Sequence, residues 1–171
     1  DGSQKSEKVW QGRKLYNAIK RLQPGAVVND RAGFGDMWTP ERTLPEDLTG
    51  YLFEACQSTD SKHWGYERKQ VLFSVPTLVE SLARMVAAGG NFLLNVGPRP
   101  DGTIEPGQAA RMRAVGQWLK THGEAVYGAE TGGVDTQSRE VLCSRKGRRL
   151  FVFFTRWPDK EAVVVPGILT K

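Results

Sequence analysis

The segment Gly89-Gly90-Asn91-Phe92-Leu93-Leu94-Asn95-Val96-Gly97-Pro98 decides the fold class of this 171-residue chain. Its first two glycines stand where a helix would end in a C-cap. The apolar run that follows them, 91–96, has the length of one buried strand. Gly97-Pro98 then opens a turn-rich loop that continues to Gly102. The segment therefore predicts a helix, a strand and a loop in immediate succession.

Amphipathic helices are predicted over residues 7–22, 77–88 and 106–122. Apolar side chains recur in each of them at helical spacing, and Pro24-Gly25 stops the first. The apolar faces of the three helices consist of Leu15, Ile19 and Leu22, of Leu78, Leu82, Met85 and Val86, and of Met112, Val115 and Leu119.

Short apolar strands are predicted at 26–29 and 51–56 as well as at 91–96. Such strands, alternating with amphipathic helices, indicate a parallel sheet covered by helices, and hence an α/β fold. Polar and aromatic loops follow the carboxyl ends of the strands, which is where a (β/α) barrel builds its active site. A doubly wound open sheet would give the same alternation, so the pattern alone leaves both architectures open.

The pattern changes after Gly128. Three β-rich runs, 141–143, 150–154 and 162–165, are separated by turn residues with no helix between them. They predict an antiparallel sheet in a separate small β domain, with a boundary between residues 129 and 130. Because three strands are few for an independent sandwich, we expect this domain to be truncated at residue 171.

The formal net charge of +5 raises the question of a nucleic-acid partner. The basic residues of the chain are scattered, apart from the cluster Arg145-Lys146-Gly147-Arg148-Arg149. This cluster precedes an apolar strand-like run. We interpret this cluster as a solvated hairpin turn rather than as a phosphate-binding patch. The sequence therefore favours neither a nucleic-acid nor a membrane partner, since it also lacks an apolar run long enough to span a bilayer.

Cys56 and Cys143 are the only cysteines, so neither a disulfide framework nor a set of metal ligands is implied. Both lie in strand-like stretches and are expected to be buried free thiols. The first six residues are polar and have no apolar core, so the chain is expected to carry no signal peptide.

Carboxylates, aromatic residues and an arginine gather in the loops that follow the predicted strands. A pyranose has an apolar face that stacks on aromatic rings and hydroxyl groups that need polar partners. Glycoside hydrolysis also needs two carboxyl groups in different environments. The residues therefore favour carbohydrate chemistry, and they are Asp30, Asp36, Glu41, Glu54, Arg31, Trp38, Trp64 and Tyr66.

Five motifs in order and spacing closely resemble the α-L-fucosidases of glycoside hydrolase family 29, over about residues 1–129. They are Val28-Asn29-Asp30-Arg31, Thr39-Pro40-Glu41, Trp64-Gly65-Tyr66, the segment 89–98 with Asp101-Gly102, and Gly123-Glu124-Ala125-Val126-Tyr127-Gly128. The resemblance implies a partial (β/α)8-type barrel, its second half, over 1–129. It implies that 130–171 begins an antiparallel β-sandwich domain.

The resemblance also implies a retaining exo-α-L-fucosidase that works by double displacement. Asp1 in Asp1-Gly2 matches the family's nucleophile. Glu41 is our first choice for the acid/base, with Glu54 as the alternative. A retaining glycosidase places its two carboxyl groups about 5–5.5 Å apart. This chemistry requires neither a metal nor an organic cofactor.

Two further positions match residues of the family that contact substrate. Arg31 matches a sugar-contacting arginine, and its alternative role is an ion pair with Asp30 or Asp36. Trp64 matches an aromatic residue that packs against the fucose ring and its methyl group, and its alternative role is packing. For Glu54 the alternative to catalysis is a carboxylate inside the barrel.

A complete barrel of this kind takes about 250 residues, so the chain is expected to supply only part of the pocket. We expect it to associate with its missing N-terminal half or with itself, and to act on a fucosylated glycan or glycoside. The alternative is an inactive fragment or a weak non-catalytic carbohydrate-binding remnant. By resemblance, the protein would be secreted, periplasmic or lysosomal.

Overall fold

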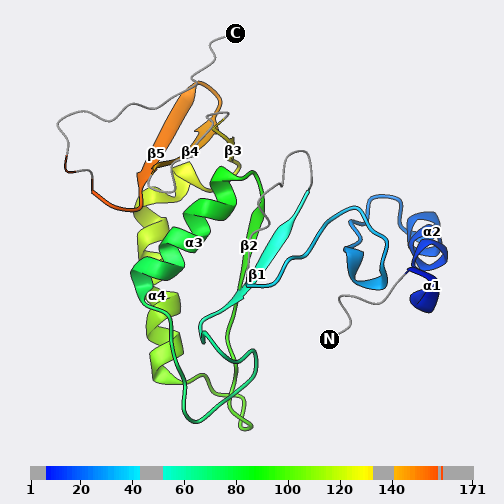
Figure 1. The fold of residues 1–171 in the computed structure, drawn as a ribbon, viewed down its shortest axis with the longest axis horizontal. Coiled ribbons are helices and arrows are strands. Elements are labelled where there is room, and N and C mark those ends of the chain that lie inside the picture. The colour runs from blue at the N-terminus through cyan, green and yellow to red at the C-terminus, as the bar shows by residue number, and fades with distance from the viewer. Residues whose placement is uncertain (1–6, 43–51, 133–140, 158, 160–171) are drawn as a thin grey trace. The chain divides into compact units, whose positions relative to one another are not determined.

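A computed structural model describes residues 7–42, 52–132, 141–157 and 159. The chain divides into two compact units, Asp1–Cys56 and Gln57–Lys171 (Figure 1). The boundary between these units falls inside the strand Glu54–Ser58.

The first predicted helix is interrupted in the structure. It forms α1 (Glu7–Trp10) and α2 (Gly12–Leu22), separated by Gln11 in the left-handed conformation with φ 49°. Gly12 is buried against the main chain of Ala32, where an added Cβ would lie 2.2 Å from the carbonyl oxygen. The break thus coincides with a close backbone approach, which helical periodicity does not reveal.

The predicted apolar face of α2 is largely exposed in this unit, with Leu15 49% and Leu22 81% accessible. Aromatic and polar contacts attach the helix instead. The ring of Tyr16 meets the ring of Phe34 edge to face at 4.9 Å, and the guanidinium of Arg13 lies 4.1 Å from the centre of the same ring. These contacts connect α2 to the loop that carries the candidate acids.

Parallel pairing organises the rest of the first unit. Single bridges join Asn29 with Met37, Trp38 with Phe53 and Glu41 with Cys56, all of them parallel. The predicted strand 26–29 is therefore reduced to one bridge residue, Asn29. The predicted strand 51–56 appears as β1 (Glu54–Ser58), preceded by the bridge residue Phe53, while residue 51 lies outside the described ranges.

The second unit contains the helix and the strand that the segment 89–98 predicts, and the helix predicted separately over 106–122. They are α3 (Val75–Ala87), β2 (Asn91–Asn95) and α4 (Pro106–His122). The main-chain N–H groups of Gly89 and Gly90 donate to the carbonyl oxygens of Val86 and Met85. This is the hydrogen-bond pattern of a Schellman C-cap, and Gly89 adopts the φ of 83° that it requires.

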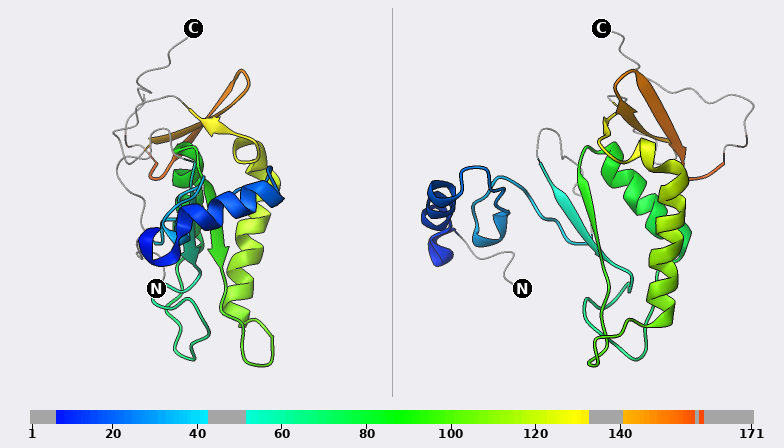
Figure 2. Two further views of the ribbon diagram at one scale, coloured as in Figure 1. Left: turned by 90° about the vertical axis from the view of Figure 1, so that its right-hand side faces the viewer. Right: turned by 180° about the vertical axis from the view of Figure 1, so that it is seen from behind.

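Helix α3 lies between β2 and α4 and packs against both (Figure 2). Its inward face is the predicted one, with Leu78 fully buried and Leu82, Met85 and Val86 nearly so. On α4 the buried positions are Gln108 and Val115, whereas Met112, predicted on that face, is 38% exposed. Strands β1 and β2 form a two-stranded sheet, so the α/β class is confirmed.

An antiparallel sheet in the order β3-β4-β5 follows, made of β3 (Glu130–Thr131), β4 (Val141–Lys146) and β5 (Arg149–Phe154). Lys146 pairs with Arg149, so the basic cluster forms the predicted exposed hairpin turn. The third predicted β run, 162–165, lies outside the described residues.

Strand β4 packs against α3 within the second unit, and the proposed domain boundary at residues 129 and 130 stays a prediction. Cys143 is buried in β4 as expected, whereas Cys56 in β1 is only half-buried. Within the described ranges, no helix is long and apolar enough to cross a membrane.

Candidate active site

Arg31 and Glu41 form an ion pair in the first unit. The Nη1 atom of Arg31 lies 2.5 Å from Oε1 of Glu41. The same guanidinium donates from Nε to the hydroxyl of Thr39 at 2.7 Å and from Nη2 to the carbonyl oxygen of Thr39 at 3.0 Å. Two residues predicted to serve one site, the sugar-contacting arginine and the first-choice acid/base, are thus in direct contact.

Local structure places Arg31 at this point. Asn29 caps the short 3-10 helix Asp30–Ala32, because its side chain accepts a hydrogen bond from the main-chain N–H of Arg31. Asp30 accepts hydrogen bonds from the main-chain N–H of Thr39 at 3.1 Å and from its hydroxyl at 2.9 Å. The two ends of the loop 30–39 are therefore tied together through Thr39, which is buried.

Parallel pairing holds Glu41. The main-chain N–H of Cys56 donates to the carbonyl oxygen of Pro40 at 2.8 Å, and the N–H of Arg42 donates to the carbonyl oxygen of Cys56 at 2.9 Å. Glu41 stands between these two bonds, so its backbone is fixed on both sides. The carboxylate and the Arg31 guanidinium are each about one-third exposed, at 35% and 31%, and a solute could reach them.

Arg31 forms its ion pair with Glu41, and not with Asp30 or Asp36, the partners expected for its alternative role. Asp30 bonds to Thr39, and Asp36 lies 2.7 Å from the ammonium of Lys20 and accepts a 2.6 Å hydrogen bond from the hydroxyl of Tyr16. The hydrogen bond from Lys20, then those from Tyr16 and the Val28 N–H, lower the pKa of Asp36 to about 2. Asp36 therefore attaches the loop to α2.

Glu54 lies on β1 with its side chain half-buried, and its main-chain N–H donates to the carbonyl oxygen of Trp38 at 2.9 Å. Its neighbours Phe53 and Ala55 are 0% and 2% exposed. Because successive side chains of a strand point to opposite faces, Glu54 and Cys56 share the face that Phe53 and Ala55 do not. Glu54 therefore lies on the less buried face of this part of β1.

The Cys56 thiol interacts electrostatically with three of the charged candidates, Arg31, Glu54 and Glu41. Burial raises its pKa, the charge of Arg31 lowers it, and the charges of Glu54 and Glu41 raise it. For Arg31, burial acts to lower the pKa, but the hydrogen bond and the charge of Glu41 outweigh it and raise the value. The guanidinium thus remains charged beside the carboxylate of Glu41.

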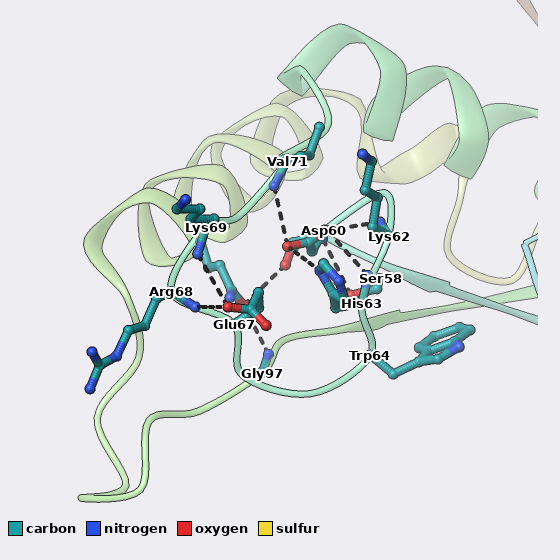
Figure 3. A network of polar contacts seen from close by, with 12 residues as sticks. Ser58, Asp60, Lys62, His63, Trp64, Glu67, Arg68, Lys69, Val71 and Gly97 are labelled. Atoms are coloured by element: carbon teal, nitrogen blue, oxygen red, sulfur yellow. Dashed lines mark hydrogen bonds and ion pairs between the residues drawn. The ribbon is translucent and has the colours of Figure 1, made fainter.

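Trp64, the predicted ring-stacking residue, belongs to the second unit. It is half-buried, and its carbonyl oxygen accepts a 2.7 Å hydrogen bond from the side-chain amide of Asn95. Figure 3 shows its indole directed away from the polar network around Asp60. Asp1, the predicted nucleophile, lies outside the described residues.

The sequence reasoning missed the network around Asp60. This carboxylate is 2% exposed and accepts hydrogen bonds from the main-chain N–H groups of Lys62, His63 and Val71. An aspartate in a turn-like stretch, which can accept from the main-chain N–H two residues further on, is the local signal for the first of these bonds. In the described part of the chain, no group of three or more His, Cys, Asp or Glu could hold a metal ion.

Comparison with known proteins adds to this geometry. A family model described as Alpha-L-fucosidase matches residues 1–124. Tissue alpha-L-fucosidase of Bos taurus is 35% identical over 155 residues, which cover 85% of this chain and 33% of that relative.

Two solved structures are similar in fold as well. One is Thermotoga maritima alpha-fucosidase in complex with a mechanism-based inhibitor, 34% identical with a TM-score of 0.70 over 84% of this chain and 35% of the other. Another is a family GH29 alpha-L-fucosidase of Bacteroides thetaiotaomicron, trapped as a covalent intermediate with 2-fluoro-fucosyl fluoride in a glutamate-to-glutamine mutant. It is 26% identical with a TM-score of 0.74 over 81% and 37% of the two chains. The chain thus spans about a third of the length of these proteins.

Proposed function

Because the chain belongs to the alpha-L-fucosidase family, we propose that it supplies the carboxyl groups and part of the sugar pocket of a retaining exo-α-L-fucosidase. In this proposal residues 1–129 are the second half of a (β/α)8 barrel, and 130–171 begin a β-sandwich domain. The substrate is a glycan or glycoside with a terminal α-L-fucose.

The ion pair between Arg31 and Glu41 carries this proposal. An acid/base must reach the glycosidic oxygen while a second group holds the sugar, so the two functions have to be neighbours. The pair is one-third exposed and fixed by strand pairing and by Thr39. When substrate binds, a hydroxyl group of the sugar would replace part of the contact between Arg31 and Glu41.

Glu41 is preferred to Glu54 as the acid/base because it is the carboxylate bonded to Arg31. The trapped intermediate of the Bacteroides thetaiotaomicron relative was obtained with a glutamate-to-glutamine mutant, which supports a glutamate in a catalytic role in this family.

The reaction has two steps. In the first, Asp1 attacks the anomeric carbon as Glu41 donates a proton to the leaving oxygen, which gives a covalent fucosyl-enzyme. In the second, water gives a proton to Glu41 and attacks the anomeric carbon, and Asp1 leaves. L-Fucose is released with its configuration retained, and the proposed chemistry uses neither a metal nor a cofactor.

Since the chain covers about a third of its relatives, we propose that activity requires the remaining part of the barrel. Full-length protein that carries this chain should release 4-nitrophenol from 4-nitrophenyl α-L-fucoside but not from 4-nitrophenyl β-D-galactoside. The 171-residue chain alone should be inactive and should regain activity with the N-terminal segment. Proton NMR should show the α-anomer of fucose first. Binding of fucose by the full-length protein without turnover would instead support the non-catalytic alternative.

A further inference from the structure

The loop 61–71, which carries Trp64, is closed at its base by paired backbone. Asp60 and Leu72 form an antiparallel bridge, Ser61 N–H donates to the carbonyl oxygen of Val71 at 2.8 Å, and Phe73 N–H donates to that of Thr59 at 3.0 Å. These bonds hold the two ends of the loop side by side.

Asp60 fixes the interior of the same loop (Figure 3). Its Oδ1 accepts from the N–H groups of Lys62 at 2.8 Å and His63 at 3.2 Å, and its Oδ2 accepts from that of Val71 at 3.3 Å. Burial acts to raise the pKa of Asp60, but these three bonds outweigh it and lower the value. The carboxylate therefore stays charged and keeps the turn before Trp64 in one conformation.

The end of β2 holds the part of the loop that contains Trp64. The side-chain amide of Asn95 donates to the carbonyl oxygen of Trp64 at 2.7 Å. Gly97 lies directly against the peptide bond between Gly65 and Tyr66. A Cβ added to Gly97 would stand 2.5 Å from the carbonyl carbon and oxygen of Gly65 and 2.8 Å from the nitrogen of Tyr66. Two positions of one strand end thus contact the backbone on the carboxyl side of Trp64.

Gly97 is itself held from α4. The Oε1 atom of Gln108 accepts from the N–H of Gly97 at 2.9 Å and from the hydroxyl of Thr59 at 3.1 Å. Gln108 and Thr59 are 1% and 0% exposed. A buried amide therefore joins the end of β2 to the base of the Trp64 loop.

We propose that Asn95 and Gly97 are positioning residues for Trp64: they fix the Trp64-Gly65-Tyr66 backbone so that the indole faces the sugar. That the indole contacts a sugar rests on the proposed function. That Asn95 and Gly97 fix its position rests on the geometry alone. Neither residue has to touch substrate, since each acts through the main chain of the loop.

A direct test of position uses ¹⁹F NMR of full-length protein labelled with 5-fluorotryptophan, in which Trp64→Phe identifies the Trp64 resonance. Asn95→Asp removes the amide donor and places a carboxylate against a carbonyl oxygen. It should shift or broaden the Trp64 resonance and leave the others in place. Asn91→Asp, the same change at the exposed start of β2, should alter none of them.

Gly97→Ala should move the same resonance, because the added methyl group cannot fit against Gly65. An unchanged Trp64 resonance in both variants would overturn the proposal. So would a collapse of all resonances in both, because that result would assign Asn95 and Gly97 to the stability of the whole fold.

A kinetic test asks whether Asn95 acts through Trp64. With 4-nitrophenyl α-L-fucoside, Asn95→Asp should lower kcat/KM by about tenfold, mainly through KM, since a misplaced binding group weakens the contact it makes. In a Trp64→Ala background the same substitution should add less than about a twofold loss, because coupled residues are non-additive. Full additivity would overturn the proposal. Absence of any fucoside hydrolysis would refute the proposed function, while the NMR result would still decide the positioning.

Discussion

The guanidinium of Arg31 and the carboxylate of Glu41, ten residues further along the chain, lie 2.5 Å apart. Each side chain is about one-third exposed. Removal of either residue therefore deprives the other of this ion pair while it is still partly shielded from water. This contact distinguishes Glu41 from Glu54, which shares the neighbourhood of Cys56 but whose fixed contact is a main-chain bond to Trp38.

Replacement of Glu41 should therefore affect the chemical step. Glu41→Ala in the full-length protein should lower kcat for an aryl fucoside by about 10²- to 10⁴-fold, the usual contribution of a general acid–base group. Added azide should restore part of the rate and give a fucosyl azide of retained configuration. Glu54→Ala serves as the matched variant and should retain most of kcat. The opposite ranking of the two variants would make Glu54 the acid/base.

The Asp36 carboxylate should make stability depend on pH. Its pKa of about 2 in the folded chain lies below the ordinary value of 3.8, so its contribution is present above about pH 4 and is lost as the pH falls towards 2. Asp36→Asn should lower the unfolding midpoint at pH 6, and the difference from wild type should shrink as the pH falls through about 2. Tyr16→Phe, which removes one bond to Asp36, should show a smaller effect. Parallel pH profiles for wild type and Asp36→Asn would contradict this prediction.

The buried amide of Gln108 should be costly to lose. Gln108→Leu would leave the Thr59 hydroxyl and the Gly97 N–H without their acceptor, and an unsatisfied buried donor costs about 1–3 kcal/mol. Gln117→Leu makes the same change at an exposed position of α4 and should alter the free energy of unfolding by less than about 0.5 kcal/mol. Urea denaturation measures both, and equal effects would mean that the bonds of Gln108 contribute nothing.

Two glycines in helices should respond to alanine in opposite directions. Gly12→Ala would place a methyl group 2.2 Å from the carbonyl oxygen of Ala32, and such overpacking costs about 1–3 kcal/mol. Gly116, inside α4, has nothing within 4 Å of its Cβ position. Gly116→Ala should therefore stabilise the chain by about 0.5–1 kcal/mol, the helical preference for alanine. Denaturation midpoints that move in the same direction would disagree with the structure.

The second unit was largely predictable because its signals are local. Gly89 is read from the sequence as a C-cap and has the φ of 83° that the cap needs. The helix predicted over 106–122 has the bounds of α4. The first unit was less predictable, because the break at Gln11 accompanies a contact between Gly12 and Ala32, 20 positions apart in the sequence.

The candidate site divides in the same way. Motif resemblance selected Arg31, Glu41, Glu54 and Trp64, but no spacing rule predicts that Arg31 pairs with Glu41 rather than with Asp36. The role of Asp36 depends on Tyr16, 20 residues earlier, and the contact of Asn95 with Trp64 spans 31 residues. These pairs form through tertiary packing, and local sequence patterns do not reveal them.

The Schellman cap between α3 and β2 also limits how the chain can change in length. Only Ala88, Gly89 and Gly90 separate the two elements. An inserted residue would shift β2 by one position and turn Asn95 to the opposite face, because side chains alternate along a strand. The Gly147-Arg148 turn connects exposed ends of β4 and β5, and it is the place where an epitope or a fluorescent tag could be inserted without disturbing the Trp64 loop.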